Sequence, residues 1–256
     1  MPLIRTSLAD AIGTIAFDRD TKRNALSAEL IAECIAAFDE FKNMHARAVV
    51  LRSVTAGKVW SAGHDIDELP KADVDPLPYN DPLEQLLRAV KAFPAPVIAM
   101  VQGSVWGGAC DLVMACDLVY GDETSSFAIT PAKLGLPYNV VGLLNFLSRL
   151  PLNVVKEMFF SADPIAADRA ERVGIVNRIV PAAELEQITY AMARTFTTRS
   201  SAAIASAKES IRVLSEATPI NPQTFEYLHG LRRGVYFGPD YHEGVASFLE
   251  KRKPKF

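Results

Sequence analysis

The sequence has few cysteines and no excess of basic over acidic residues. Its three cysteines, Cys34, Cys110 and Cys116, form no CxxC pair and stand in apolar or helical surroundings. We therefore expect reduced core residues, as is usual in a reducing cytoplasm. The 27 basic and 30 acidic side chains give a formal net charge of -3, so no positive excess is present to hold a nucleic acid.

Long apolar runs and common cofactor motifs are also missing. Nowhere do about 18 apolar residues follow one another, as a membrane helix requires. No uninterrupted apolar stretch follows a basic end in MPLIRTSLADAIGTIAFD, so we expect no export, no membrane partner and a cytoplasmic location. The chain has no GxGxxG motif, and His45, His229 and His242 lack the spacing of metal ligands, so no metal is expected.

The hydrophobic pattern of the first half predicts alternating strands and helices. Hydrophobic residues make up 49% of the chain, enough for a sizeable core in 256 residues. Apolar runs at 10–17, 47–53 and 97–101 indicate buried strands. Apolar residues recur at helical spacing over 26–44, with Ser27 as the expected N-cap. This part of the chain is therefore predicted to be α/β.

The second half is predicted to be mostly helical. A helix at 107–117 and strands at 117–121 and 125–129 complete the α/β pattern. After Pro137 we expect amphipathic helices around 140–149, 151–160, 181–197, 201–215 and 240–250, with one strand at 174–179. The Pro-rich stretch at 70–82 is expected to be a surface loop, either a plain connection or a lid that faces a ligand.

Two glycine-containing turns each follow a strand-like segment, SAGHD at 61–65 and GSVWGGA at 103–109. Glycines at the start of a helix let the backbone approach a ligand, and the free N–H groups there can hold an oxyanion. Most glycine turns are only turns, so this pattern alone leaves both interpretations open.

Five segments, in this order, resemble the enoyl-CoA hydratase/isomerase, or crotonase, family over essentially the whole chain: NALSAEL, VWSAGHDIDEL, VIAMVQGSVWGGACDLVMACDL, SSFAITPAKLGLPY and FLEKRKPKF. The resemblance implies an α/β, crotonase-type ββα spiral core that binds acyl-CoA at residues 1–190. It also implies a C-terminal helical trimerisation region at 191–256, in a homotrimer or a dimer of trimers.

The resemblance further implies an oxyanion hole made by the backbone N–H groups of His64 and Gly108, with Gly107 beside it. Family members that hydrate double bonds carry two glutamates, and the matching positions here hold Asp111 and Ala132. Hydration needs a positioned acid and base. Decarboxylation needs an oxyanion hole and an apolar site for the departing carboxylate, so loss of the second acid at Ala132 favours it.

Tyr138, in LPYN, matches a tyrosine that contacts a substrate carboxylate in decarboxylating members of the family, and Thr130 is a second candidate hydroxyl. The expected reaction converts methylmalonyl-CoA to propionyl-CoA. The thioester itself accepts the electron pair, so no cofactor is expected and coenzyme A is part of the substrate. Tyr138 alone is also typical of a core aromatic, and Asp111 of an acid in a helix's first turn.

The resemblance assigns seven residues to coenzyme A: Arg23, Ala25, Ala62, Asp65, Ile66, Phe248 and Lys251. It implies that Phe248 and Lys251 reach the adenine and 3'-phosphate region, typically from a neighbouring subunit. Lys251 to Lys253 would also suit a helix end, where cations offset the dipole. Two other functions stay open, a hydratase or isomerase acting on an enoyl-CoA and a non-catalytic acyl-CoA-binding protein.

Overall fold

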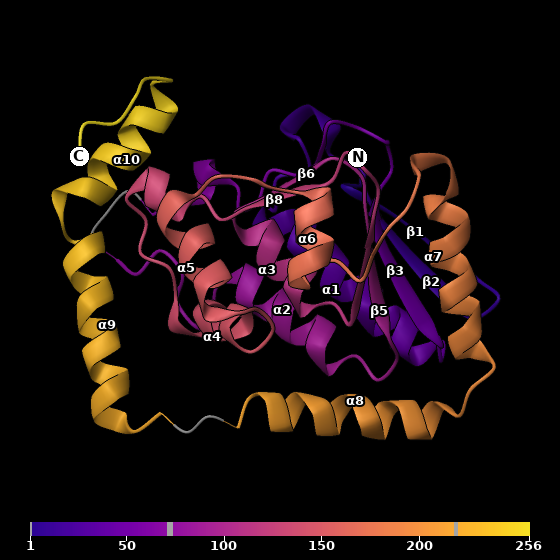
Figure 1. The fold of residues 1–256 in the computed structure, drawn as a ribbon. Coiled ribbons are helices and arrows are strands. Elements are labelled where there is room, and N and C mark those ends of the chain that lie inside the picture. Colours follow the sequence, from indigo (N-terminus) through magenta and orange to yellow (C-terminus); the bar gives the residue numbers. More distant parts are fainter. Residues whose placement is uncertain (1, 71–73, 218–219) are drawn as a thin grey trace.

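A six-stranded sheet is the larger of two sheets in the computed structural model, which describes residues 2–70, 74–217 and 220–256 (Figure 1). Its strand order is β1-β2-β3-β5-β7-β10. The strands are β1 (Ile4–Ala9), β2 (Ile12–Phe17), β3 (Ala48–Ser53), β5 (Val97–Val101), β7 (Leu118–Gly121) and β10 (Arg178–Ile179). β1 and β2 form an antiparallel hairpin, and each later pair is parallel. Parallel neighbours need crossover connections, which the helices supply.

The second sheet positions the glycine turns. It has the order β4-β6-β8-β9, with β4 (Val59–Ser61), β6 (Ser104–Trp106), β8 (Ser126–Ala128) and β9 (Ile165–Ala166). β4, β6 and β8 are parallel to one another, and β9 is antiparallel to β8. Because parallel strands end at the same edge, the segments that follow β4, β6 and β8 meet there.

Helices cover both faces of the larger sheet. One core contains residues of α1 (Ala28–Asn43), α2 (Pro82–Ala92) and α3 (Gly108–Ala115), together with α4 (Val140–Leu147), α5 (Leu152–Ser161) and α6 (Ala167–Val173). α7 (Ala182–Thr197) covers the opposite face and packs on β2, β3, β5 and β7. Two apolar layers therefore enclose the sheet.

The last three helices extend around the body of the molecule: α8 (Ser201–Ser215), α9 (Pro222–Tyr236) and α10 (Pro239–Leu249). In Figure 1, α8 runs beneath the sheet, α9 rises at the left side and α10 lies at the upper left beside the C-terminus. α7 continues across residues 190 and 191, where the sequence suggested a domain boundary. In the described part of the chain, no helix is both long enough and apolar enough to span a bilayer.

The predicted α/β pattern is confirmed, including the β2-α1-β3 unit and the helical C-terminal third. Ser27 caps α1 by accepting a hydrogen bond from the backbone N–H of Leu30. All three cysteines are free and buried. Sequence reasoning missed β1, β6 and β9 among the strands and α2, α6 and α9 among the helices. Part of the expected 70–82 loop, 71–73, lies outside the described residues, and the loop ends where Asp81 caps α2 at Pro82.

Candidate active site

The two glycine turns lie against each other at the edge of the second sheet. Gly63 has a φ of +85°, and a Cβ there would lie 2.3 Å from the carbonyl oxygen of Trp106, so only glycine fits. Gly107 also has a positive φ and is the N-cap residue of α3. A Cβ on Gly108 would lie 3.6 Å from the backbone nitrogen of His64, so the two expected oxyanion donors are neighbours.

Both of these N–H groups are free. In the part of the chain that the structure describes, neither the His64 nor the Gly108 N–H donates a hydrogen bond, although the N–H groups of Asp65 and Gly107 beside them do. His64 and Leu26 form a parallel bridge. In this bridge the Leu26 N–H donates to the Gly63 carbonyl oxygen, and the Leu26 carbonyl oxygen accepts from the Asp65 N–H, so the His64 N–H takes no part in it. The Gly108 N–H is free because it opens α3. Two adjacent free donors at a helix N-terminus can stabilise a developing oxyanion.

A small cavity of about 50 Å³ adjoins these donors. Its apolar wall consists of Ile66, Leu69, Leu77, Leu83, Pro131, Leu134 and Leu136. Its polar groups come from His64, Asp111, Thr130, Tyr138 and Asn139, next to Gly107 and Gly108. The cavity can therefore hold a small, largely apolar group beside a few fixed polar atoms.

Asp111 and Tyr138 form a buried pair at this cavity. The Tyr138 hydroxyl donates a hydrogen bond to one carboxylate oxygen of Asp111, and the other oxygen has no partner among the described residues. Burial raises the pKa of Asp111 to about 7, the hydrogen bond from Tyr138 opposes this shift, and the charge of Glu84 adds to it. Burial and the charge of Asp111 raise the pKa of Tyr138 well above its usual value, so the phenol stays neutral.

The His64 ring lies between the cavity and the start of α2. Its Nε2 is 3.6 Å from Asp81 Oδ2, and its Nδ1 is 3.1 Å from the Asp65 carbonyl oxygen. Burial alone would lower the pKa of His64, but the hydrogen bond and charge of Asp81, with the Asp65 carbonyl and Glu68, together raise it. The imidazole therefore carries more positive charge near neutral pH than a free histidine does.

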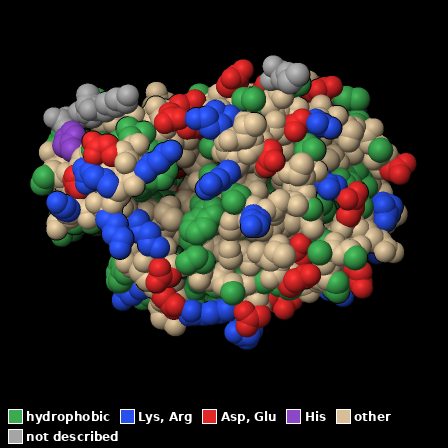
Figure 2. Space-filling model, turned by 90° about the horizontal axis from the view of Figure 1, so that it is seen from above, with side chains coloured by type: hydrophobic (Ala, Val, Ile, Leu, Met, Phe, Trp, Pro, Cys, Tyr) green, Lys and Arg blue, Asp and Glu red, His purple; other side chains and the backbone are tan. Residues whose placement is uncertain are grey.

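A longer groove of about 690 Å³ shares His64, Thr130, Ala62 and Ile66 with the cavity and leads away from it. Figure 2 shows Lys and Arg side chains around a hollow with hydrophobic side chains on this face of the molecule. All seven residues that the resemblance assigned to coenzyme A line this groove: Arg23, Ala25, Ala62, Asp65, Ile66, Phe248 and Lys251. The structure thus brings together residues that are as far apart in the sequence as 23 and 251.

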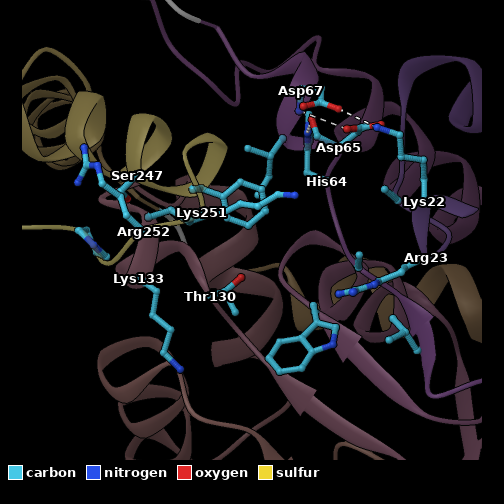
Figure 3. Close-up of a pocket in the computed structure, with 18 of the residues that line it drawn as sticks. Lys22, Arg23, His64, Asp65, Asp67, Thr130, Lys133, Ser247, Lys251 and Arg252 are labelled. Atoms are coloured by element: carbon cyan, nitrogen blue, oxygen red, sulfur yellow. Dashed lines mark hydrogen bonds and ion pairs between the residues drawn. The ribbon is translucent and has the colours of Figure 1, made fainter.

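Two cations of the groove are free to meet an anionic ligand. Most of the others are paired: Lys22 with Asp67, Lys133 with Asp163, and Arg252 with Glu243 and Glu250. Arg23 and Lys251 form no ion pair within the described residues, and they point into the groove from opposite sides (Figure 3). Unpaired cations on both sides of a groove suit a phosphate-bearing ligand.

Phe248 and Lys251 both lie at the end of α10 and line the groove of their own chain. That a neighbouring subunit supplies them stays a prediction. A close contact between backbones brings α10 to the groove. A Cβ on Gly244 would lie 1.9 Å from the Leu134 carbonyl oxygen, and a Cβ on Gly135 2.2 Å from the Asp240 carbonyl oxygen. Two glycines therefore let α10 dock on the 3-10 turn at Pro131–Leu134.

Ala132 and Asp65 lie differently from the other candidate residues. Ala132, expected to be a substrate-binding position that lacks the second acid of the hydratases, is exposed on the 3-10 turn and lines neither the cavity nor the groove. Asp65 lines the groove, but its carboxylate forms a nearly buried ion pair with Arg19 at 2.7 Å. Arg19 also donates to the Ala25 carbonyl oxygen, and thereby ties the segment before α1 to the SAGHD turn.

Sequence reasoning missed several residues near the site. Glu84 is buried and accepts a hydrogen bond of 2.6 Å from Asn139 Nδ2, and Asn139 in turn caps α4 through the Gly142 N–H. Burial raises the pKa of Glu84. The N-cap pattern of Asn139 was readable from the sequence, but nothing local connected it to Glu84, which is 55 residues earlier.

Comparison with known proteins gives matches over nearly the whole chain. The family model for enoyl-CoA hydratase/isomerase matches residues 7–256. Methylmalonyl-CoA decarboxylase from Escherichia coli K12 is 46% identical over 245 residues, which are 96% of this chain and 94% of that protein. Carnitinyl-CoA dehydratase from Shigella flexneri is 32% identical over 249 residues, covering 94% of this chain and 92% of that one.

Solved structures give the same result. A methylmalonyl-CoA decarboxylase in complex with 2-nitronate-propionyl-CoA superimposes with a TM-score of 0.97 at 44% identity, covering 99% of this chain and 98% of that one. A methylmalonyl-CoA decarboxylase complexed with 2S-carboxypropyl-CoA also gives a TM-score of 0.97 at 44% identity, covering 100% and 98%.

Proposed function

The chain belongs to the enoyl-CoA hydratase/isomerase, or crotonase, family, and we propose that it decarboxylates methylmalonyl-CoA to propionyl-CoA. The observation that carries this proposal is the pairing of Tyr138 with Asp111 in a small apolar cavity beside two free backbone N–H groups. A relative 46% identical to this chain, methylmalonyl-CoA decarboxylase, supports the choice of substrate. With this activity the protein is a carboxy-lyase that needs no cofactor.

The reaction begins with the thioester oxygen in the oxyanion hole. The N–H groups of His64 and Gly108 donate to this oxygen as negative charge develops on it. The bond between the α-carbon and the carboxylate breaks, its electron pair moves into the thioester carbonyl, and CO₂ and an enolate form. The α-carbon of the enolate then takes up one proton to give propionyl-CoA. The thioester is itself the electron acceptor, so the step requires no further group.

Tyr138 orients the carboxylate that leaves. Its hydroxyl donates one hydrogen bond and holds the breaking bond perpendicular to the thioester plane, where it overlaps the carbonyl π system. When Asp111 is ionised, it accepts this same proton and competes with the substrate. When Asp111 is protonated, it can donate to the phenol oxygen and leave the phenol proton to the substrate. A pKa of about 7 for Asp111 therefore makes Tyr138 available at neutral and lower pH.

Thr130 is the remaining hydroxyl of the cavity and forms part of the groove as well. A Cβ on Gly107 would lie 3.2 Å from Thr130 Oγ1, so this hydroxyl is next to the oxyanion turn. We assign to Thr130 the binding of a water that delivers the proton to the enolate. The coenzyme A moiety occupies the groove, with its phosphates at Arg23 and Lys251 and its adenine near Ala62 and Ile66.

The second function to be tested is hydration of an enoyl-CoA, because Asp111 retains one acid in the cavity and hydratases are among the family members. The test incubates the purified protein with methylmalonyl-CoA, malonyl-CoA and crotonyl-CoA separately and identifies the products by mass. Propionyl-CoA from methylmalonyl-CoA, and little 3-hydroxybutyryl-CoA, is the expected result. Rapid hydration of crotonyl-CoA with methylmalonyl-CoA left intact would refute the proposal.

We also propose a homotrimer or a dimer of trimers, with the C-terminal helices as the trimerisation region. Large apolar side chains are exposed on α8 and α9, among them Leu214, Ile211 and Leu231, and burial in an interface would remove them from water. Light scattering after size-exclusion chromatography tests the assembly. The three free, buried cysteines suit a reducing cytoplasm, where we place the protein.

A further inference from the structure

The C-terminal helices of the same chain pack behind the outer wall of the acyl cavity. Leu69 packs with Tyr236 at the end of α9 and with Tyr241 and Val245 of α10 in a separate small core. Ile66 and Leu136 pack against that core, and together with Leu69 they also line the cavity. The shape of the cavity therefore depends on helices that lie outside the central body of the fold.

A buried arginine of α9 holds another part of this wall. Arg232 is 6% exposed, and its two terminal nitrogens donate to both carboxylate oxygens of Asp75, at 2.9 and 2.6 Å. The same Asp75 accepts the backbone N–H of Leu77 at 3.0 Å, and the Leu77 carbonyl oxygen lies 3.4 Å from Arg232. Leu77 is thus fixed at both its N–H and its C=O, and its side chain lines the cavity.

The guanidinium of Arg232 forms its hydrogen bonds with one segment of the chain, which contains Asp75 and Leu77. The third nitrogen, Nε, has no hydrogen-bond partner in the described part of the chain, so every hydrogen bond that Arg232 donates there goes to Asp75 or Leu77. A bidentate pair fixes orientation as well as distance. Desolvation offsets much of the attraction between charges that are removed from water. The pair of Arg232 and Asp75 therefore contributes little to stability, and its main effect is to fix the position of Leu77.

We infer that Arg232 is a positioning residue that sets the acyl-size specificity of the active site, by holding Leu77 against a cavity that admits a methyl branch and excludes longer ones. The inference rests on the proposed function for the acyl class it names. A hydrophobic pocket discriminates one methylene by about 10- to 200-fold. Displacement of Leu77 by about the width of a methyl group would remove that discrimination.

The experiment compares kcat/KM for methylmalonyl-CoA, ethylmalonyl-CoA and butylmalonyl-CoA. The double variant Arg232→Met with Asp75→Asn removes both charges of the pair together, and Arg233→Met, its exposed neighbour on α9, is the matched control. We expect the methyl-to-butyl preference to fall by about tenfold in the double variant and to stay unchanged in the control. Arg232→Lys keeps the positive charge but cannot donate to both carboxylate oxygens of Asp75 in the same way. Its methyl-to-butyl preference should lie between those of the wild type and the double variant.

Leu77→Ala acts on the wall directly and should reproduce the loss of preference. Calorimetry with propionyl-CoA and hexanoyl-CoA measures the same selectivity without any decarboxylation, so it separates this inference from the proposed function. If the double variant fails to fold, Arg232→Lys and Leu77→Ala decide the matter. An unchanged preference in folded Arg232→Lys and Leu77→Ala, in both turnover and binding, would overturn the inference. Absence of decarboxylase activity in the unmodified protein would refute only the proposed function.

Discussion

Replacement of Asp111 by asparagine should change how the stability of the protein depends on pH. Asp111 is 2% exposed, and burial raises the pKa of its carboxyl from 3.8 to about 7 in the folded state. Asparagine has nearly the same shape and can still accept the Tyr138 hydroxyl, but it does not titrate. A comparison of the two proteins across pH therefore isolates the cost of ionising this one buried group.

The sign follows from the number of protons bound. Between pH 3.8 and about 7 the folded protein keeps the Asp111 proton and the unfolded chain has lost it, so the free energy of unfolding falls as pH rises. Each pKa unit corresponds to about 1.4 kcal/mol. From pH 5 to pH 8 the wild-type protein should lose about 2.5 kcal/mol through Asp111, and Asp111→Asn should not lose it. The contributions of His64 and of other groups that do not interact with Asp111 cancel in the difference.

Urea unfolding of both proteins at pH 5 and pH 8 provides the measurement. Asp111→Asn should gain about 2.5 kcal/mol relative to wild type on going from pH 5 to pH 8, whatever its absolute stability. Asp39→Asn, an exposed substitution on α1, is the control and should show no such change. An equal difference between the proteins at both pH values would show that Asp111 does not ionise over this range, and the reasoning about Tyr138 would then fail as well.

The other predictions concern the donors and the groove. Tyr138→Phe should lower kcat for methylmalonyl-CoA by about 10- to 100-fold with KM nearly unchanged, because one hydrogen bond to a charged group is lost; a normal kcat would contradict the assigned role. Gly108→Ala places a Cβ 2.5 Å from Leu83 Cδ2 and close to the His64 N–H, and should reduce kcat/KM by about 10²- to 10³-fold while circular dichroism stays native. Lys251→Ala should raise KM by about tenfold, weaken its dependence on salt and spare kcat. Lys251 lines the groove of its own chain. If it binds coenzyme A there, mixed oligomers of Lys251→Ala and Tyr138→Phe subunits should not regain low-KM activity, and a regained low KM would indicate a contact between subunits.

The residues expected at coenzyme A line one groove, and the sequence could predict this grouping because they occur in short motifs with a fixed backbone geometry. The turn that contains Gly63 and the turn that contains Gly107 require positive φ values, and the parallel pairing of β4 with β6 brings them together. Apolar periodicity likewise predicted α1 and the central strands, since their buried faces dominate the local composition.

Contacts between distant segments could not be predicted in this way. Arg232 is an ordinary surface-type residue in the sequence, and only the docking of α9 brings it to Asp75, 157 residues away. The exposure of Ala132 was not readable from the sequence either, because a position matched to a family motif does not specify which way a side chain on a 3-10 turn faces. Helix α2 was not predicted because the Pro-rich segment before it indicated a loop.

The retention of an acid at Asp111 needs a physical explanation in a site that must receive another carboxylate. Two ionised carboxylates in a poorly solvated cavity would repel each other, and this repulsion would weaken substrate binding. Burial resolves the conflict because it favours the neutral form of Asp111 up to a pH of about 7. Neutral Asp111 still holds the Tyr138 ring in place, with the edges of Phe146 and Phe159 against that ring. We infer that the acid acts on the acyl group through Tyr138, whose hydroxyl it contacts, and not as a second charge beside the substrate.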